Sequence, residues 1–407
     1  LPGERISLGT ATDTLIAEAG ARVVIPGPTA NTNWPQPGGT ATNAPGHLAA
    51  RANLTKQWST SAGTGSSSEG RLTSAPIIIA GRAYVLDSSA NVSAISLSSG
   101  KRAWRVSLVP EGEDASEGFG GGLAADFGRI IAVTGFGNVV ALDPATGQKV
   151  WTRELGLPIR TAPTASNGRV YVVTVNNQVY ALDIESGEVV WDFRRSSQSA
   201  GVLSNTSPAV SGTTVVIPYK SGEILGFDTQ SGKPIWGDAL TRTGRRSSVS
   251  SLNDIAGRPV ISGNAVYAVS NSGRMAAINL KTGARLWGKN IASTQTPWVA
   301  GDTIFVATLD AKVVALSKKD GKIIWVAALP RFADPGSNEE AIRYSGPVLA
   351  GGRLLLVSSK GTLFSLIPET GGIAAQIPAG DSFYIPPVVA GGTVFLLSDN
   401  ATLTAYR

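Results

Sequence analysis

The chain has 407 residues with a formal net charge of +6, and 42% of its residues are hydrophobic while only 16% are charged. It contains no cysteine and a single histidine, which excludes disulfides, thiolate metal sites and multi-histidine metal sites. No stretch reaches the roughly 18–20 uninterrupted apolar residues that a membrane-spanning helix needs. The chain begins at Leu1 and not at Met, so we expect a processed product whose signal peptide and lipid-anchor cysteine lie upstream.

Residues 1–53 carry no repeat and are rich in Pro, Gly, Thr and Asn. We expect them to form an extended arm that packs on one face of the domain formed by residues 54–407, anchored by Trp34 and Pro35. The single histidine, His47, lies in this arm after a Pro-Gly turn. No G-x-S-x-G motif accompanies it, so we interpret it as structural and predict no catalytic triad.

Beyond the arm, a glycine recurs four positions before a tryptophan. The pairs are Gly100 with Trp104, Gly147 with Trp151, Gly187 with Trp191, Gly232 with Trp236, Gly283 with Trp287, and Gly321 with Trp325. Successive tryptophans are separated by roughly 40–50 residues, which is the length of a four-stranded propeller blade.

The clearest repeat unit is TAPTASNGRVYVVTVNNQVYALDIESGEVVWDFRR, residues 161–195. Short β-branched runs separated by Asn-Asn and Ser-Gly turns predict four antiparallel strands. Related units occupy 74–108, 121–155, 206–240, 257–291, 295–329 and 345–379, the last with Ala375 in place of the tryptophan. An eighth unit begins at Ile385 and has only three strands, so we predict that residues 54–60 supply its fourth strand. The fold class is therefore an all-β, eight-bladed propeller of four-stranded antiparallel blades.

Each residue of the glycine and tryptophan signature has a structural explanation. Glycine allows a positive φ in the hairpin before the outer strand, and tryptophan can bury a large flat surface between blades with its N–H bonded to a backbone carbonyl. We therefore assign a structural role to Trp58, Trp104, Trp151, Trp191, Trp236, Trp287 and Trp325.

The charged segments do not indicate an enzyme. The acidic segment Glu111–Glu117 lacks the glycine-framed spacing of a calcium loop, so we expect a solvated loop and no metal site. The basic segment Arg242–Arg246 has no interleaved aromatic residues, which argues against nucleic-acid binding.

The repeated A-P…G-R-V-Y…A-L-D…S/T-G…W pattern resembles the repeat of pyrroloquinoline-quinone (PQQ) dehydrogenases and their non-enzymatic relatives. The segments LPGERISL, WPQPGGTATNAPGHLA, PYKSGEI and NDIAGRPVISG more narrowly resemble the BamB family of outer-membrane assembly factors, in its α-proteobacterial form. This resemblance implies a periplasmic lipoprotein of the β-barrel assembly machinery, peripheral to the outer membrane and without a cofactor. It further implies a scaffold that binds the POTRA domains of BamA, aids the folding and insertion of outer-membrane proteins, and meets unfolded clients.

The resemblance also implies two partner-binding loops. Leu157, Ile159 and Arg160 fit the family's L-x-L-R segment, and Asp254 keeps the first acid of its D-x-D segment while Ala256 replaces the second. Without the resemblance, Leu157 and Ile159 would be interpreted as capping a blade and Arg160 as a solvated charge. Two alternative functions remain at this point, a PQQ-dependent dehydrogenase and a ligand-sensing propeller.

Overall fold

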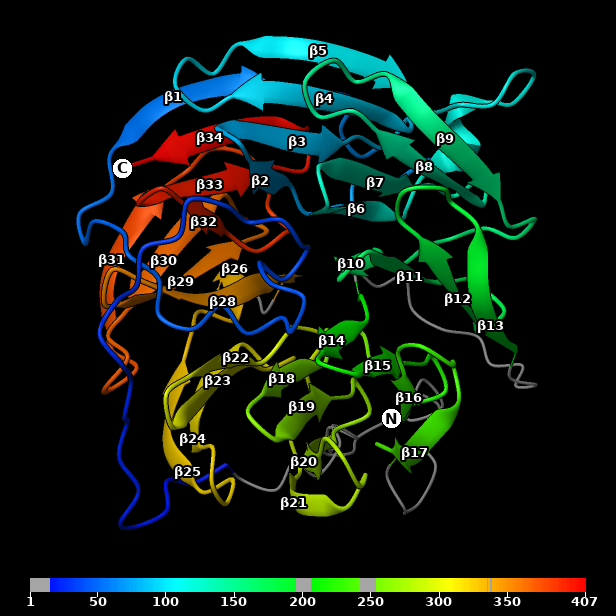
Figure 1. The fold of residues 1–407 in the computed structure, drawn as a ribbon. Helices are drawn as coiled ribbons and strands as arrows, with labels where there is room; N and C mark the ends of the chain where they lie inside the picture. Colours follow the sequence, from blue (N-terminus) through cyan, green and yellow to red (C-terminus); the bar gives the residue numbers. More distant parts are fainter. Residues whose placement is uncertain (1–14, 195–205, 242–253, 335, 337–338) are drawn as a thin grey trace, which may run out of the picture.

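The computed structural model describes residues 15–194, 206–241, 254–334, 336 and 339–407. In this part of the chain, eight four-stranded antiparallel sheets surround a central axis, as predicted from the repeats. Figure 1 shows each blade with its first strand near the axis and its fourth strand at the rim. The two middle strands are almost wholly buried, whereas the outer strands are largely exposed, as the packing of blades face to face requires.

The first four blades follow one another directly along the chain. Their strands are β2 (Ile77–Ile79), β3 (Arg82–Leu86), β4 (Asn91–Ser96), β5 (Arg102–Ser107); β6 (Gly122–Asp126), β7 (Arg129–Val133), β8 (Asn138–Leu142), β9 (Lys149–Glu154); β10 (Thr164–Ser166), β11 (Arg169–Val173), β12 (Gln178–Asp183), β13 (Val189–Arg194); and β14 (Ala209–Ser211), β15 (Thr214–Pro218), β16 (Glu223–Asp228), β17 (Pro234–Ala239). A short 3-10 helix, η1 (Ala115–Gly118), lies between the first and second blades.

The last four blades complete the ring. Their strands are β18 (Val260–Ser262), β19 (Ala265–Val269), β20 (Met275–Asn279), β21 (Arg285–Lys289); β22 (Trp298–Ala300), β23 (Thr303–Ala307), β24 (Lys312–Ser317), β25 (Ile323–Ala328); β28 (Tyr344–Ala350), β29 (Arg353–Ser358), β30 (Thr362–Leu366), β31 (Ile373–Pro378); and β32 (Val388–Ala390), β33 (Thr393–Leu397), β34 (Thr402–Tyr406) with β1 (Lys56–Ser61). A two-stranded hairpin, β26 (Phe332–Asp334) and β27 (Glu339–Ala341), lies between the sixth and seventh blades.

Strand β1 closes the ring by pairing antiparallel with β34, as predicted from the three-stranded final repeat. Trp58 lies opposite Ala405, and Thr55 exchanges backbone hydrogen bonds with Arg407 at 3.1 and 2.9 Å. The two ends of the propeller sequence therefore meet within one sheet, and the β34 edge is covered.

The tryptophans link each blade to the next. Trp151 Nε1 donates a hydrogen bond of 3.0 Å to the Ile184 carbonyl of the following blade. A Cβ built on Gly187, whose φ is +71°, would lie 2.6 Å from the Trp151 ring, so only glycine fits at this close approach. The same bond is made by Trp58 to Leu97, Trp104 to Pro144, Trp191 to Thr229, Trp236 to Leu280, Trp287 to Lys318, and Trp325 to Pro368.

Ala375 stands in the tryptophan position of the seventh blade. The eighth blade, which follows it, has no hairpin on which a tryptophan could pack. In every other blade the tryptophan packs on the hairpin that joins the third and fourth strands of the next blade. The eighth blade has no such hairpin, because its third and fourth strands, β34 and β1, come from opposite ends of the propeller sequence. Ala375 is accordingly exposed in β31.

The N-terminal arm closes one end of the axial channel. Trp34 is 3% exposed and pairs with Ile78 of the first blade. Further hydrogen bonds join the arm to the other seven blades: Gln36 to Ala125 and Ala165, Asn43 to Pro208 and Pro259, Gly46 to Trp298, Leu48 to Leu349, and Asn31 to Val389. The arm therefore contacts the inner part of all eight blades.

His47 is part of this arm and is buried. Its Nε2 accepts a hydrogen bond of 2.9 Å from the Gly352 amide, so Nδ1 is the nitrogen that can donate to the Pro26 carbonyl, 2.7 Å away. Both ring nitrogens therefore hold the arm in place, in agreement with a structural role.

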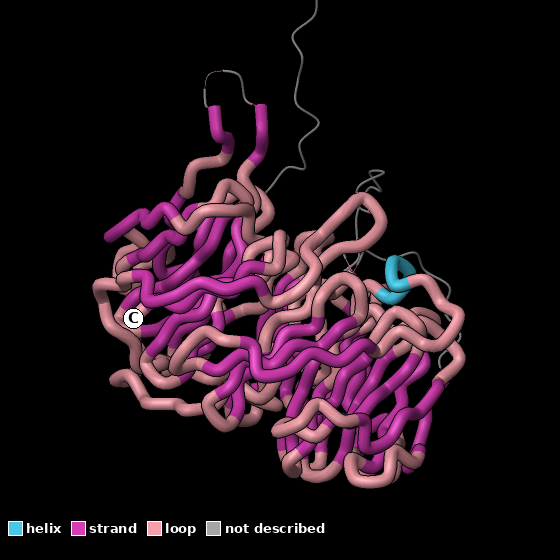
Figure 2. Tube along the Cα trace, turned by 90° about the horizontal axis from the view of Figure 1, so that it is seen from above, coloured by secondary structure: helices cyan, strands magenta, loops and turns pink. Residues whose placement is uncertain are grey.

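The two faces of the ring differ in the connections that they carry. Tight hairpins between the first and second strands and between the third and fourth strands lie on one face, which we call the hairpin face. The connections between blades lie on the other, the loop face, from which η1 and the β26–β27 hairpin project (Figure 2). Within the described residues, no helix has the length and apolarity needed to span a bilayer.

Candidate functional site: the inter-blade loops

The connection between β9 and β10 carries three of the predicted partner-binding residues. Ile159 is fully buried in the core between the second and third blades, packed with Ala165 and Leu155. The Val175 amide donates a 3.0 Å hydrogen bond to the Pro158 carbonyl, which fixes the loop from the other side. The Ile159 side chain therefore anchors the loop and is not part of the exposed surface.

Leu157 and Arg160 remain accessible on the loop face, and both are half-buried. The Arg160 guanidinium lies 3.8 Å from the centroid of the Phe119 ring, and its Nη1 donates a hydrogen bond to the Phe119 carbonyl. Burial lowers the pKa of Arg160 from its ordinary value of 12.5, yet arginine stays protonated in proteins. These contacts hold the charge in one place, so Arg160 is not a freely solvated side chain.

Arg160 and several acidic side chains line one groove with a volume of about 710 Å³. The groove contains one arginine and four glutamates, which are Glu69, Glu113, Glu117 and Glu154. Two of them belong to the acidic segment Glu111–Glu117, in which Asp114 caps η1 by accepting the Ser116 amide at 2.8 Å. This hydrogen bond holds the pKa of Asp114 below its usual value. We call this groove, which Arg160 helps to line, the acidic groove.

The sequence did not reveal the acidic groove. The acidic segment and Arg160 are far apart in the chain and meet because successive inter-blade connections lie next to each other on the loop face. The regular repeat length does indicate that both inter-blade connections lie on the same face. From this, the acidic segment and Arg160 could have been predicted to lie near each other.

Asp254 lies on the connection that leads to β18, also on the loop face. It is 1% exposed, and the next residue, Ile255, is fully buried between the fourth and fifth blades. The Asp254 carbonyl accepts a 3.1 Å hydrogen bond from the Asn271 amide. Its carboxylate therefore lies below the surface, and the residues that follow it as far as Val260 are buried as well. The basic segment Arg242–Arg246 lies outside the described residues.

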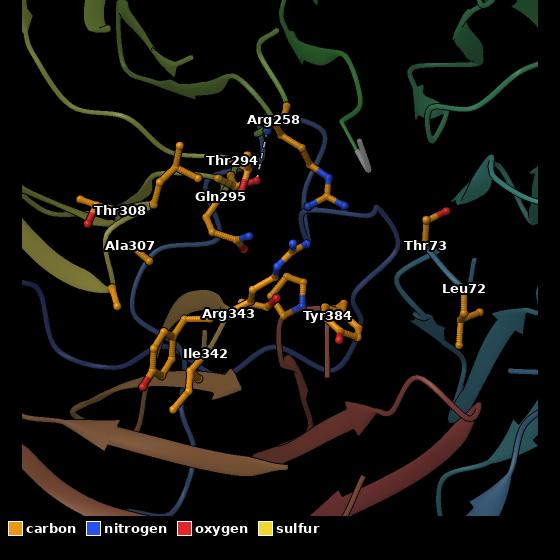
Figure 3. Close-up of a pocket in the computed structure, with 17 residues that line it drawn as sticks. Leu72, Thr73, Arg258, Thr294, Gln295, Ala307, Thr308, Ile342, Arg343 and Tyr384 are labelled. Carbon is orange, nitrogen blue, oxygen red and sulfur yellow. Dashed lines mark hydrogen bonds between the residues drawn. The ribbon is translucent and has the colours of Figure 1, made fainter. Parts of the chain in front are cut away.

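A second cavity lies on the propeller axis and has a volume of about 520 Å³ (Figure 3). Arg258, Arg343, Gln295 and Tyr384 are among the residues that line it. Among the described residues, no aspartate or glutamate lines this cavity and no three metal-ligating side chains cluster. The cavity wall therefore supplies neither an acidic ligand for Ca²⁺ nor a carboxylate base, and it does not fit the site of a calcium-dependent quinoprotein.

Two kinds of solved structure share this fold. The crystal structure of BamB from Moraxella catarrhalis has a TM-score of 0.71 at 22% identity, covering 87% of this chain and 100% of that one. A quinohaemoprotein alcohol dehydrogenase from Comamonas testosteroni has a TM-score of 0.72 at 14% identity, covering 92% of this chain and 80% of that one. At these identities the likeness establishes the fold and does not separate the two kinds of protein.

The sequence matches to the two kinds of protein differ in length, and a quinoprotein ethanol dehydrogenase from Pseudomonas aeruginosa matches 28% of this chain at 32% identity, covering 21% of the relative. An outer membrane protein assembly factor BamB from Xanthomonas campestris is 28% identical over 359 residues, covering 86% of this chain and 85% of the relative. The sequence profile described as outer membrane protein assembly factor BamB matches residues 46–118, 90–327 and 333–407. Nearly the whole propeller is therefore matched, and the chain belongs to the family of outer membrane protein assembly factor BamB.

Proposed function

We propose that this protein is a non-enzymatic scaffold of the outer-membrane β-barrel assembly machinery that docks on the POTRA domains of BamA through its loop face. The observation that carries the proposal is the Arg160 loop, held rigidly at the edge of the acidic groove in a chain of the BamB family. In this role the protein has no cofactor and no catalytic residue. It aids the folding and insertion of outer-membrane proteins.

The Arg160 loop suits a protein partner because its charge is held in position before binding. The Phe119 ring and carbonyl occupy one side of the guanidinium, and the groove side remains available to a carboxylate of the partner. A guanidinium can bind such a carboxylate with two parallel hydrogen bonds. Leu157, half-buried on the same loop, offers an adjacent apolar contact.

The acidic groove adds a requirement on the partner. With four glutamates and one arginine, the groove carries an excess of negative charge at neutral pH. A complementary POTRA surface therefore presents basic residues toward the groove and one acid toward Arg160. Asp254 and Ile159 position their loops in this arrangement, and they act through the backbone that they fix.

The remaining parts of the proposal concern location and clients. We place the protein at the periplasmic face of the outer membrane, held by a lipid anchor upstream of Leu1. Unfolded outer-membrane proteins are the proposed clients, and an extended client strand could add to an exposed outer strand of a blade by β-augmentation.

A binding measurement with the purified POTRA domains of BamA tests the proposal. We expect Arg160→Glu to weaken binding by about tenfold or more, because a hydrogen bond to a charged group contributes about 1.5–3 kcal/mol. Arg102→Glu makes the same charge change at the exposed start of β5, on the hairpin face, and serves as the matched control. Unchanged affinity in Arg160→Glu, with an unchanged circular dichroism melting curve, would show that this loop is not the docking site.

The enzymatic alternative has a separate test. The purified chain is incubated with PQQ and Ca²⁺, and dye-linked oxidation of alcohols is followed by absorbance. We expect no quinone-dependent turnover. Turnover above that of the cofactor alone would overturn the scaffold function, whereas loss of POTRA binding in Arg160→Glu would not follow from an enzymatic role.

A further inference from the structure

Arg258 lies on the wall of the axial cavity as a buried cation, and no described residue forms an ion pair with it. It is 4% exposed, and its Nε and Nη2 atoms have no hydrogen-bond partner. These two nitrogens form one edge of the guanidinium, the edge that binds both oxygens of a carboxylate side by side. Burial of an unpaired charge is costly, so proteins pair such groups or use them to bind an ion.

A second guanidinium faces the same space. Figure 3 shows Arg343 and Arg258, which come from different inter-blade connections, both pointing into the axial cavity, with Gln295 and Tyr384 beside them. Gln295 Oε1 accepts a hydrogen bond of 3.2 Å from the Gly346 amide, so its NH₂ group is left to donate into the cavity. Because none of the described residues on the wall is acidic, the cavity combines two positive charges with neutral hydrogen-bond donors.

Apolar and aromatic side chains form part of the remaining wall, together with four threonines and a serine. Leu72, Leu309, Ile342 and the rings of Tyr344 and Tyr384 contribute to it, and the volume of about 520 Å³ lies within the usual range of small-ligand sites. The arm closes the hairpin-face end of the channel, where Asn43 bonds to the Pro208 and Pro259 carbonyls. A ligand therefore enters from the loop face.

We propose that the axial cavity is a binding site for a carboxylate attached to an apolar or aromatic group, with Arg258 and Arg343 as the residues that recognise the carboxylate. This site is separate from the docking loop at Arg160 and does not depend on the proposed scaffold function. The carboxylate belongs either to a free small molecule or to a short peptide end that enters the cavity. Burial lowers the pKa of Arg258 to about 10, so the group keeps its charge at neutral pH.

Calorimetric titration of the full chain with small probes tests the site. The probes are isophthalate, inorganic phosphate, and an apolar tetrapeptide with either a free or an amidated carboxyl terminus. We expect isophthalate to bind at millimolar or lower concentration. Binding of the free peptide but not of its amide would assign the site to peptide ends, and binding of isophthalate alone would assign it to small molecules. Phosphate that binds as tightly as isophthalate would overturn the assignment to carboxylates.

Variants connect the binding to the two arginines. Arg343→Gln changes an exposed side chain and should weaken isophthalate binding by about tenfold, as expected for the loss of a charge-assisted hydrogen bond. Arg258→Gln should weaken it at least as much, and Arg343→Gln keeps the test valid if the buried change prevents folding. Arg353→Gln, at the start of β29 on the hairpin face, is the control. If neither isophthalate nor the free peptide binds the unaltered chain, or if Arg353→Gln weakens binding equally, the proposal is refuted.

Discussion

Replacement of Trp191 by alanine should destabilise the propeller by about 4 kcal/mol, within the range of about 3–5 kcal/mol for truncating a buried tryptophan. The side chain is 8% exposed and its ring centroid lies 6.0 Å from that of Tyr171 and 6.2 Å from that of Phe227. Its indole N–H donates a 2.9 Å hydrogen bond to the Thr229 carbonyl of the fourth blade. The substitution therefore removes packing within the third blade and the link to the next blade at the same time.

Two further variants separate the contribution of the indole hydrogen bond from that of packing on the neighbouring hairpin. Trp191→Phe keeps an aromatic ring but loses the N–H, and it should cost about 1–2 kcal/mol because the Thr229 carbonyl loses its partner. Ala375→Trp adds an indole at the exposed position of β31, where no hairpin is present to receive it, and should change stability by no more than about 0.5 kcal/mol. Equilibrium urea unfolding followed by far-ultraviolet circular dichroism measures all three.

Two outcomes would contradict the role assigned to the tryptophan links. A cost below about 1 kcal/mol for Trp191→Ala would show that the tryptophan links carry little of the stability. A gain for Ala375→Trp comparable to the loss in Trp191→Ala would show that the indole stabilises a blade without the hairpin of its neighbour.

Three further changes test the fold. A chain that begins at Ala62 lacks both the arm and β1 and exposes the edge of β34, so size-exclusion chromatography should show oligomers or aggregates; a monomer as stable as the full chain would contradict ring closure by β1. Gly321→Val should cost about 2 kcal/mol or more in urea unfolding, because a Cβ there would lie 2.7 Å from the Trp287 ring at a φ of +70°; no loss would show that the contact can relax. The Ser231 hydroxyl and amide lower the pKa of Asp228, so its ionised form stabilises the fold at neutral pH and this contribution is lost as the pH falls through the folded-state pKa. Unfolding midpoints of Asp228→Asn and the unaltered chain should therefore converge in acid; a constant difference between pH 7 and acid would contradict the assignment.

The blades were predictable because each one is specified locally. Turn residues, β-branched runs and the glycine before the tryptophan lie within one repeat, so the sequence predicts the strands and their order. Ring closure was also predictable, since the last repeat lacks one strand and residues 54–60 match it. The reason why Ala375 replaces the tryptophan was not predictable, because it depends on where the two ends of the propeller sequence meet.

The arm and the candidate site are held by contacts that produce no repeating pattern in the sequence. The arm pairs through its backbone and through Gln36 and Asn43, with partners spread over the whole sequence. The family pattern selected Ile159 and Asp254 as contact residues, but a pattern of residue types does not distinguish a side chain that meets a partner from one that holds the loop. Burial distinguishes them, and both residues lie below the surface.

The arm fills one end of the axial channel, so the two faces of the propeller are not equivalent. Trp34 lies within the arm on the axis, and its ring stacks on Trp298 with centroids 6.4 Å apart, so the hairpin-face end is filled by protein. The acidic groove and the axial cavity both lie on the loop face, where inter-blade connections supply their residues. A partner docked at Arg160 would therefore stand on the same side as the entrance to the cavity. If a POTRA domain covers that entrance, isophthalate and the POTRA domain should compete. If it leaves the entrance open, they should bind independently, and a titration of one in the presence of the other measures this coupling.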